Sequence, residues 1–426
     1  MDDMTRRQVV LTRLRIQNFK SLADTEDMVI RPLTFLVGPN SAGKSSVLQA
    51  LLLLRQTVDE RDPNITLKFN GPWVRLGSYL DCAHRAADED PGSRELEIGF
   101  TFQFGPLPVD FSARFGYNGE MFLERVSYGG YTEEFVIKRV GPQQYRRADS
   151  DTSIRLRKFY DYSPGQSKKE TDPFGLDDPD ALLFPAWAIR SLFSTVFYLG
   201  PLRQRPQPSY QASGEVPQDV GLAGERAIDV LIVSDKRKED APLAQVRHWL
   251  DVFDIASDAQ LIAHTPTLYE FRLTDKQTGV VVNYPHVGFG ASQIVPLIVE
   301  GFYSPDRSVL LIEQPEIHLH PRAQARLADL LVAISQESKT LIVETHSEHL
   351  LSQVQVRIAQ GGLNRDDVAI YYFEPTPAGA HVIPIAINEL GQFGNWPAGF
   401  FDQGLKLADA HLHAIAGAQG QGDGRD

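Results

Sequence analysis

The chain has 426 residues, 42% of them hydrophobic and 10% aromatic, so we expect a folded protein with a large core and exclude global disorder. Its net charge of −13 excludes a bulk nucleic-acid binder, so any DNA contact needs a local basic face. The single cysteine, Cys82, excludes a disulfide framework and a cysteine-cluster metal site, and it suits the cytoplasm, where we expect the protein. We expect no signal peptide and no transmembrane helix, because no stretch approaches roughly eighteen apolar residues.

The first motif is a phosphate-binding loop that follows a short apolar strand. Strands are predicted over residues 9–19 and 33–37, and residues 38–45 then fit the pattern G-x-x-x-x-G-K-[ST]. A helix without breakers is predicted from Ser46. Glycines let backbone N–H groups surround phosphates, and the helix N-terminus adds favourable dipole charge. The sequence therefore predicts that the protein binds a nucleoside triphosphate together with Mg²⁺.

Two side chains of this loop have specific expected roles. Lys44 would reach the β- and γ-phosphates, and the hydroxyl of Ser45 would hold Mg²⁺. The residues expected to bind the nucleotide are Gly38, Asn40, Ser41, Ala42, Gly43, Lys44, Ser45 and Ser46.

A large antiparallel insertion is predicted after the first helix. Four short β-like runs alternate with Gly and Pro at intervals of roughly ten residues, as antiparallel meanders do. These runs cover residues 96–104, 109–117, 122–128 and 134–140. Residues 161–180 are polar and are expected to form a surface loop, and residues 417–426 a disordered tail.

Basic residues cluster near the end of the insertion, and two interpretations of them remain open. The cluster is either a solvated surface balanced by Asp149 and Asp151, or a strip that contacts the DNA backbone, which salt-sensitive binding would reveal. Lys138 and Arg139 begin the cluster. The residues that the second interpretation assigns to DNA are Arg146, Arg147, Arg155, Arg157 and Lys158.

The second half supplies carboxylates and a histidine for the same site. Residues 308–313 are predicted to form the strand beside the phosphate-loop strand, and Glu313 at its end offers an oxygen ligand to Mg²⁺. Glu316 follows as a second carboxylate. Residues 339–344 predict another buried strand, which leads to His346 at an edge where ligands bind in open α/β sheets.

A glycine turn at residues 287–293 precedes an apolar helix predicted over residues 294–302. Ser292 is predicted as its N-cap, with Pro296 in the first turn. The N-terminus of this helix is a second candidate anion site. Elsewhere, Arg203 and Arg205 are expected either to contact phosphate or to form structural ion pairs, and His318 and His320 to have interface or structural roles rather than to bind metal.

The order and spacing of these motifs resemble an ABC-class ATPase. The sequences Ile-Glu-Gln-Pro-Glu-Ile-His-Leu-His-Pro at 312–321 and Glu-Thr-His-Ser at 344–347 more narrowly resemble the RecF-like and OLD (overcoming lysogenisation defect) ATPases. Residues 288–293 resemble the signature of these proteins, and residues 198–203 are similar to a segment common in them. Residues 396–402 look like an uncharacterised C-terminal module found in one branch.

The resemblance implies an α/β fold, an ABC-type P-loop ATPase head with a mixed central sheet, an inserted antiparallel β subdomain and a helical signature lobe. It implies this division of the chain: 1–160, ATPase lobe with phosphate loop and insertion; 161–300, helical signature lobe; 301–376, acidic strand and switch histidine; 377–405, C-terminal module; 406–426, tail.

The family pattern also implies a homodimer, or a higher assembly, that closes around two ATP molecules. Each nucleotide would lie between the phosphate loop of one subunit and a signature segment of the other, so that γ-phosphate charge is shared by two helix N-termini. His346 would sense the γ-phosphate, and Glu313 would take the magnesium role. The signature residues are Gly290, Ala291, Ser292 and Gln293.

Two residues depart from the family pattern. Gln314 stands where ABC ATPases place the Glu that positions or deprotonates the attacking water, and an amide cannot act as a base. Either Glu316 substitutes, or hydrolysis is slow and the ATP-bound dimer long-lived, or the sequence carries a mutation; we favour slow turnover. Ser292 occupies a glycine position of the signature when the two are aligned on Gln293.

The function expected from this resemblance is an ATP-driven switch that clamps DNA or controls a separate effector, a nuclease or toxin, in DNA repair or anti-phage defence. The alternative is an OLD-like ATP-dependent nuclease component, which would need a C-terminal metal-binding domain. We disfavour it because only about eighty residues follow His346. The ATP-binding subunit of a transporter is disfavoured further.

Overall fold

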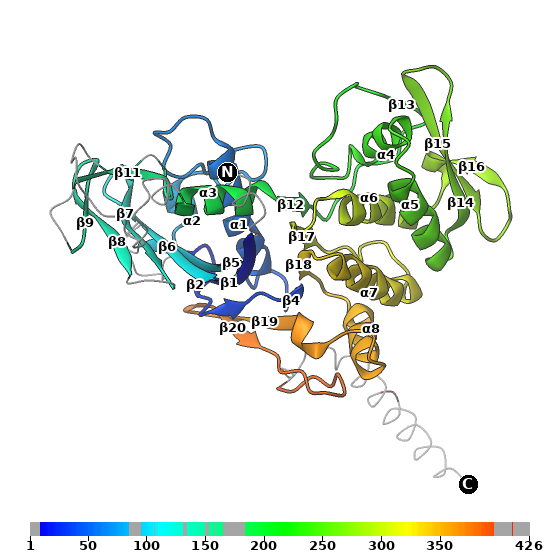
Figure 1. The fold of residues 1–426 in the computed structure, drawn as a ribbon. Helices are drawn as coiled ribbons and strands as arrows, with labels where there is room; N and C mark the ends of the chain where they lie inside the picture. The colour runs from blue at the N-terminus through cyan, green and yellow to red at the C-terminus, as the bar shows by residue number, and fades with distance from the viewer. Residues whose placement is uncertain are drawn as a thin grey trace, which may run out of the picture.

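The computed structural model describes residues 9–84, 95–105, 107–130, 134–149, 153–156, 158–164, 184–395 and 411. Within these residues a sheet of sixteen strands runs through the molecule, and a second sheet of four strands lies at the helical end (Figure 1). Most of the predicted polar loop at 161–180, the segment 396–402 and the tail at 417–426 lie outside the described residues.

The parallel part of the large sheet contains the phosphate-loop strand. In spatial order its strands are β19 (Val368–Thr376), β4 (Leu33–Val37), β18 (Thr340–Glu344), β17 (Val309–Glu313) and β12 (Val196–Leu199). Neighbours in this set run parallel. Every residue of β4 and β18 is buried, as expected for parallel strands that are covered on both faces.

The predicted position of the strand that ends at Glu313 is wrong. β17 does not pair with the phosphate-loop strand, because β18 lies between the two. The connection from β17 through α7 (Pro321–Gln336) returns the chain to the side of β17 that faces β4. The direct neighbour of the phosphate-loop strand is therefore the strand that ends at Glu344.

The remaining strands of the large sheet form an antiparallel arm. The predicted strand at 9–19 and the four predicted runs are confirmed as β1 and β5 to β8. In β5 buried and half-buried residues alternate along the whole strand, as they do when one face packs on a core. The arm contains β1 (Val9–Phe19), β2 (Leu22–Asp24), β3 (Met28–Val29), β5 (Leu96–Phe104), β6 (Leu107–Tyr117), β7 (Met121–Gly129), β8 (Phe135–Gly141), β9 (Gln144–Arg147), β10 (Ser153–Leu156) and β11 (Tyr162–Pro164), and β20 (Gly379–Pro384) joins it to β19.

Two hydrophobic cores lie on opposite faces of the parallel strands. Leu36 of β4 packs in the core of the antiparallel arm, whereas Leu33, Phe35 and Val37 pack in the core of the helical end. The first core includes α1 (Lys44–Asp59), α2 (Tyr79–Cys82) and α3 (Phe184–Ser194). The second includes α4 (Ala227–Lys236), α5 (Ala241–Val252), α6 (Phe289–Tyr303), α7, α8 (Glu348–Ala359) and three strands of the small sheet, β13 (Tyr210–Gln211), β14 (Ala256–Ala263) and β15 (Leu268–Asp275). The fourth strand of that sheet, β16 (Val281–Asn283), pairs with β15 and is not buried in this core. In the described ranges, no helix is both long and apolar enough to cross a membrane.

Helix α6 begins earlier than the sequence predicts, and Ser292 is not its N-cap. The N-cap is Gly288, and the N–H of Ala291 already donates to the carbonyl of Gly288 at 3.1 Å. Ser292 is therefore buried inside the helix, and Pro296 lies in the helix interior rather than in the first turn. A Cβ on Gly224 would lie 2.4 Å from the Cβ of Pro296, so a neighbouring loop packs tightly on this proline.

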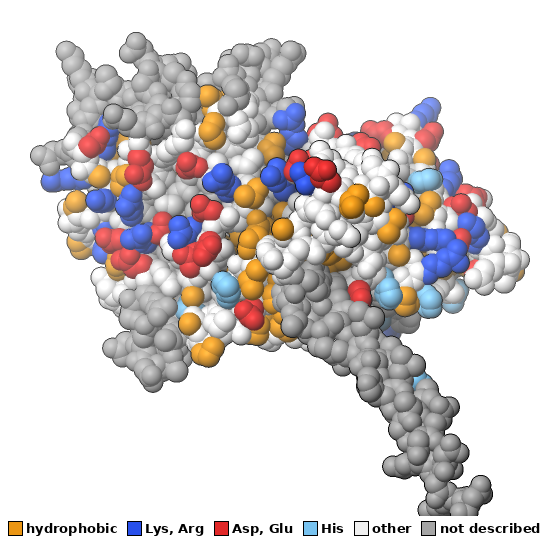
Figure 2. All heavy atoms as spheres, turned by 90° about the horizontal axis from the view of Figure 1, so that it is seen from below, with side chains coloured by type: hydrophobic (Ala, Val, Ile, Leu, Met, Phe, Trp, Pro, Cys, Tyr) orange, Lys and Arg blue, Asp and Glu red, His pale blue; other side chains and the backbone are white. Residues whose placement is uncertain are grey.

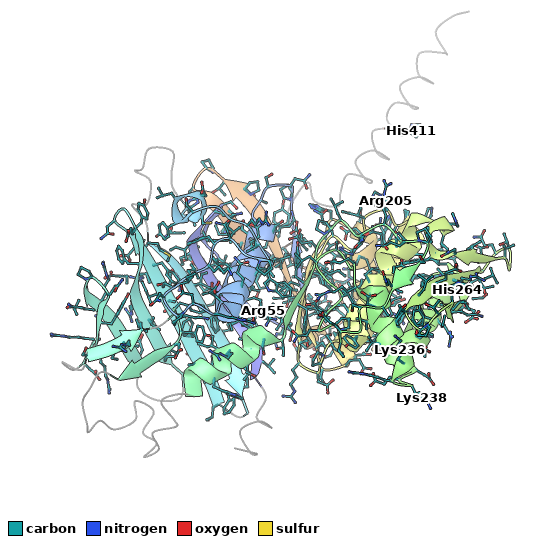
Figure 3. The ribbon with its side chains drawn as sticks, turned by 90° about the horizontal axis from the view of Figure 1, so that it is seen from above. Arg55, Arg205, Lys236, Lys238, His264 and His411 are labelled. Atoms are coloured by element: carbon teal, nitrogen blue, oxygen red, sulfur yellow. The ribbon has the colours of Figure 1, made fainter. Side chains whose placement is uncertain are left out.

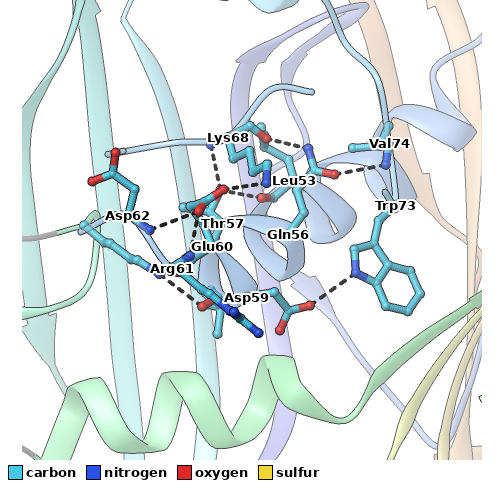
Figure 4. A network of polar contacts seen from close by, with 12 residues as sticks. Leu53, Gln56, Thr57, Asp59, Glu60, Arg61, Asp62, Lys68, Trp73 and Val74 are labelled. Carbon is cyan, nitrogen blue, oxygen red and sulfur yellow. Dashed lines mark hydrogen bonds and ion pairs between the residues drawn. The ribbon is translucent and has the colours of Figure 1, made fainter. Parts of the chain in front are cut away.

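Lys158 is a structural residue, which corrects its assignment to a DNA-contact strip. The side chain is buried, and its ammonium donates to the carbonyls of Thr57 at 3.0 Å and Val58 at 3.1 Å, and to that of Glu60. These carbonyls belong to the end of α1, where a cation also interacts favourably with the helix dipole. Figure 4 shows the surrounding polar network, in which Glu60 accepts from the ammonium of Lys68 at 2.5 Å.

The other basic residues of the cluster differ in what they contact. Arg147 pairs with Asp149 at 2.5 Å, as the solvated-surface interpretation requires. Arg146 and Arg155 are exposed, and Arg157 lies outside the described residues. Figure 2 shows basic and acidic side chains interspersed over one face of the antiparallel arm.

We predict that Lys158→Met destabilises the protein by about 2 kcal/mol, because carbonyls at the end of α1 would stay buried without a donor. The measurement is the midpoint of urea denaturation. Arg155→Met, at an exposed position in the same insertion, is the control and should shift stability by less than about 0.5 kcal/mol. Equal midpoints for the two variants would contradict the structural role of Lys158.

Candidate nucleotide-binding site

The phosphate loop connects β4 to α1, and two of its glycines are required by its backbone. Gly38 and Gly43 have φ angles of +139° and +102°, which side chains disfavour. A Cβ on Gly38 would lie 2.5 Å from the carbonyl oxygen of Phe373 in β19, and one on Gly43 would lie 2.7 Å from the Oγ of Ser21. The loop is therefore packed closely against β19 and the turn between β1 and β2.

Lys44 is buried and lies within its own loop. Its ammonium donates to the carbonyls of Gly38 at 3.1 Å and Pro39 at 2.8 Å, and it lies 3.9 Å from a carboxylate oxygen of Glu344. Burial lowers the pKa of Lys44, while the nearby charges of Glu344 and Glu316 act in the opposite direction. A phosphate bound in the loop could accept the hydrogen bonds that these carbonyls now accept.

Glu344 belongs to the candidate site, and sequence reasoning missed it. The Oγ of Ser45 donates to its Oε2 at 2.6 Å, and the carboxylate is buried. The sequence carried a signal, because Glu344 ends an apolar strand in the same way as Glu313 does. The wrong strand order concealed it, since β17 was expected beside the loop and only Glu313 was given the magnesium role.

Glu313 and Glu344 occupy paired positions on β17 and β18. Burial, followed by the charge of Glu344, raises the pKa of Glu313 to about 7, and a hydrogen bond with Tyr198 opposes this rise. Two carboxylates and the Ser45 hydroxyl form a set of hard oxygen donors. This donor set fits Mg²⁺, whose charge would also relieve the repulsion between the carboxylates.

The loops that follow β17 and β18 are tied together by Glu316. Its Oε1 accepts from the backbone N–H of His346 at 2.6 Å, whereas its Oε2 is buried and has no hydrogen-bond partner among the described residues. Burial raises the pKa of Glu316. Gln314 has a φ of +42°, and its N–H donates to the carbonyl of Glu344 at 2.8 Å.

His346 presents an available ring nitrogen at this edge of the sheet. Burial, and then the charge of Lys44, lower the pKa of the imidazole, so it is neutral at pH 7. Its Nε2 is buried without a hydrogen-bond partner in the described part of the chain. The next residue, Ser347, fixes this position, because its Oγ accepts from the N–H of Leu350 at 3.0 Å and caps α8.

The signature segment is exposed only at its beginning. Gly288 is exposed, and Gly290 is half-buried. The remaining signature residues, Ala291, Ser292 and Gln293, are buried within the chain itself. The N-cap of α6, Gly288, has no side chain and makes no side-chain cap hydrogen bond, so the anion-binding groups that this residue offers belong to the backbone. His320 caps α7 by accepting from the N–H of Arg322 at 3.4 Å, a structural role as expected.

Comparison with known proteins agrees with this geometry. Residues 33–352 match the family described as "AAA domain, putative AbiEii toxin, Type IV TA system", and residues 363–410 match "Protein of unknown function (DUF3696)". The second match covers the segment 396–402, which the sequence assigned to an uncharacterised C-terminal module.

An OLD nuclease from Thermus scotoductus (strain ATCC 700910 / SA-01) is 23% identical over 356 residues, which cover 79% of this chain and 59% of the relative. The chain thus spans less than two thirds of that relative. Among solved structures, an SmcHead bound to the C-winged helix domain of ScpA has a TM-score of 0.51 at 14% identity, covering 89% of this chain and 98% of that one. An Smc head with an extended coiled coil, from Pyrococcus furiosus, has a TM-score of 0.48 at 15% identity, covering 96% and 100%.

The likeness to the first of these heads concerns the fold, which is that of an ABC-type ATPase head, as expected. The family match covers most of the chain, including the phosphate loop and both acidic strands. Such P-loop ATPases use a nucleotide, typically with Mg²⁺. The chain has the fold of an ABC-type ATPase head, and it belongs to the AAA domain family that its residues 33–352 match.

Proposed function

We propose that this protein is an ATP-driven molecular switch, two copies of which close around two ATP molecules. The observation that carries the proposal is the convergence of Lys44, Ser45, Glu313, Glu344 and the free Nε2 of His346 at one edge of the sheet. The loop residues Gly38, Asn40 to Gly43 and Ser46 would hold the phosphates beside them.

Ser45 and Glu313 would hold Mg²⁺. Glu344 would be a third ligand, because its carboxylate accepts a hydrogen bond of 2.6 Å from the Ser45 hydroxyl. The cation would neutralise charge on the β- and γ-phosphate oxygens. Lys44 would exchange the carbonyls of its own loop for phosphate oxygens, and the Nε2 of His346 would donate to the terminal phosphate.

Dimerisation is supported by the uncapped N-terminus of α6. Its backbone N–H groups and helix dipole would receive the γ-phosphate held by a second copy, a contact that ADP cannot make. Of the expected signature residues, Gly290 is placed to take part through its backbone. Ala291, Ser292 and Gln293 would support the turn from within, because their side chains are buried.

Slow hydrolysis is proposed because Gln314 stands where the catalytic base is expected. Gln314 can orient water but cannot accept its proton. Glu316 has one oxygen committed to the N–H of His346, and its second oxygen is buried, which makes it the alternative base. A long-lived ATP-bound dimer suits a switch better than a motor.

The output of the switch is proposed to be DNA engagement, through Arg146 and Arg155, or control of a separate nuclease or toxin in the cytoplasm. The family description names a toxin of a Type IV toxin–antitoxin system, and the matched relative is named a nuclease. These names support a role in anti-phage defence or DNA repair. The name of the nuclease relative also supports the alternative, an ATP-dependent nuclease component.

We predict that Lys44→Ala weakens ATP binding at least about 100-fold, the value of about two charge-assisted hydrogen bonds, and abolishes the ATP-dependent dimer. Calorimetric titration measures the affinity, and light scattering after size exclusion measures the mass. Lys276→Ala, on the exposed turn after β15, is the control. Unchanged ATP affinity in Lys44→Ala would remove the central assignment.

Glu344→Gln should raise the Mg²⁺ concentration needed for half-maximal ATP binding about tenfold, because one oxygen donor loses its charge. The comparison is a Mg²⁺ titration at fixed ATP. Glu348→Gln changes an exposed acid at the start of α8 and should leave the Mg²⁺ requirement unchanged. If Glu344→Gln behaves as Glu348→Gln does, Glu344 has no part in cation binding.

Gln314→Glu should accelerate ATP hydrolysis at least about tenfold, because it places a carboxylate where the attacking water is expected. Phosphate release under saturating ATP is the measurement, and Gln314→Ala is the comparison. Rapid hydrolysis by the natural protein, lost in Glu316→Gln but kept in Gln314→Ala, would instead identify Glu316 as the base and contradict slow turnover.

A further inference from the structure

Arg203 carries a buried charge that the nucleotide site as described leaves unexplained. None of its three guanidinium nitrogens is accessible to solvent, and none has a hydrogen-bond partner among the described residues. The structural ion pair considered from the sequence is not formed with any carboxylate in the described part of the chain. Arginine stays protonated in proteins, so the cost of an unpaired buried cation cannot be avoided by deprotonation.

The backbone around Arg203 holds the side chain in this position. The N–H of Gly200 donates to the carbonyl of Leu222 at 2.8 Å, and the N–H of Gln204 donates to the carbonyl of Ala223 at 2.8 Å. Leu202 and Gln204 on either side of it are exposed. Arg203 is therefore turned inward between two anchored points.

Its location is the edge of the sheet where the candidate site lies. Arg203 follows β12, which pairs in parallel with β17, so its segment begins level with Glu313. Burial lowers the pKa of Arg203 to about 10, and the neighbouring Tyr198 and Glu313 oppose this change. Tyr198 hydrogen-bonds to Glu313, so the arginine lies next to the cation ligands without pairing with them.

The distance between β4 and β12 along the sheet edge limits which part of a bound nucleotide Arg203 can contact. Three strand spacings, roughly 14 Å, separate β4 from β12. If the phosphate loop at β4 holds the inner phosphates and the triphosphate extends toward β18 and β17, its last phosphate lies closest to β12. A side chain that extends from the end of β12 toward β17 would then contact the terminal phosphate first.

We propose that Arg203 is a phosphate-binding residue of the same subunit, whose guanidinium pairs with the γ-phosphate and so distinguishes ATP from ADP. The inference rests on the proposed nucleotide-binding function and adds a residue to it. A guanidinium supplied within the same chain stabilises charge on a transferring phosphoryl group, and its planar donors match phosphate oxygens.

The test is calorimetric binding of Mg²⁺ with a non-hydrolysable ATP analogue, and separately with ADP, to the full chain. Arg203→Gln should weaken the ATP analogue about tenfold or more and leave ADP within about twofold. Arg203→Lys should recover part of the loss, because it restores charge without the planar fork. Arg205→Gln is the matched control, since Arg205 is exposed at the surface of the helical end (Figure 3).

Thermal unfolding separates this role from a structural one. Without nucleotide, Arg203→Gln should unfold no earlier than the natural protein, because an uncompensated buried charge has been removed. With the ATP analogue it should gain less stabilisation. If Arg203→Gln binds both nucleotides tightly and the ratio of ATP-analogue to ADP affinity is unchanged, the role of Arg203 is wrong, while the proposed function still holds. Failure of the natural protein to bind either nucleotide would overturn the proposed function, and this inference with it.

Discussion

The hydrogen bond of 2.6 Å between the Ser45 hydroxyl and Glu344 is the contact on which the site depends. It joins the beginning of α1 to the end of β18, and it places a buried carboxylate 3.9 Å from the ammonium of Lys44. Glu316 is a second carboxyl group whose charge acts on the same lysine, and Glu313 lies beside Glu344 at the paired position of β17. Burial, and then the charge of Glu344, raise the pKa of Glu313 to about 7, and a divalent cation between the two carboxylates would offset their repulsion.

The polar groups of this edge follow a common pattern, in which one part of each residue is anchored and another part is left available. Glu316 uses one oxygen to hold the His346 backbone and keeps the other unpaired, while His346 is fixed through its N–H and keeps Nε2. Arg203 is anchored by its neighbours' backbone and leaves its guanidinium without a partner. Buried polar groups normally find partners, and in the function proposed above the nucleotide and its cation would supply the partners at this edge.

Local features of this chain could be predicted from sequence, and features that depend on the path of the chain could not. The phosphate loop and the strands of the antiparallel arm follow from glycine positions and from alternation within a few residues. The order of β17 and β18 depends on where α7 packs, and Glu344 was missed for that reason. Lys158 stands in a run of charges that is indistinguishable from a solvated surface, and only the folded insertion brings it to α1. Gly288, rather than Ser292, begins α6 because the helical bonds start at residues that carry no capping signal.

Lys158, whose ammonium binds the carbonyls at the end of α1, links the antiparallel arm to the helix that follows the phosphate loop. α1 has 16 residues, a length of about 24 Å, with Lys44 at one end and the ammonium of Lys158 on the carbonyls of the other. α1 and this contact therefore form a continuous connection between the antiparallel arm and the phosphate loop. Thermodynamic linkage is reciprocal: if a ligand of the arm changes nucleotide affinity through this connection, nucleotide changes the affinity of the arm for that ligand by the same factor.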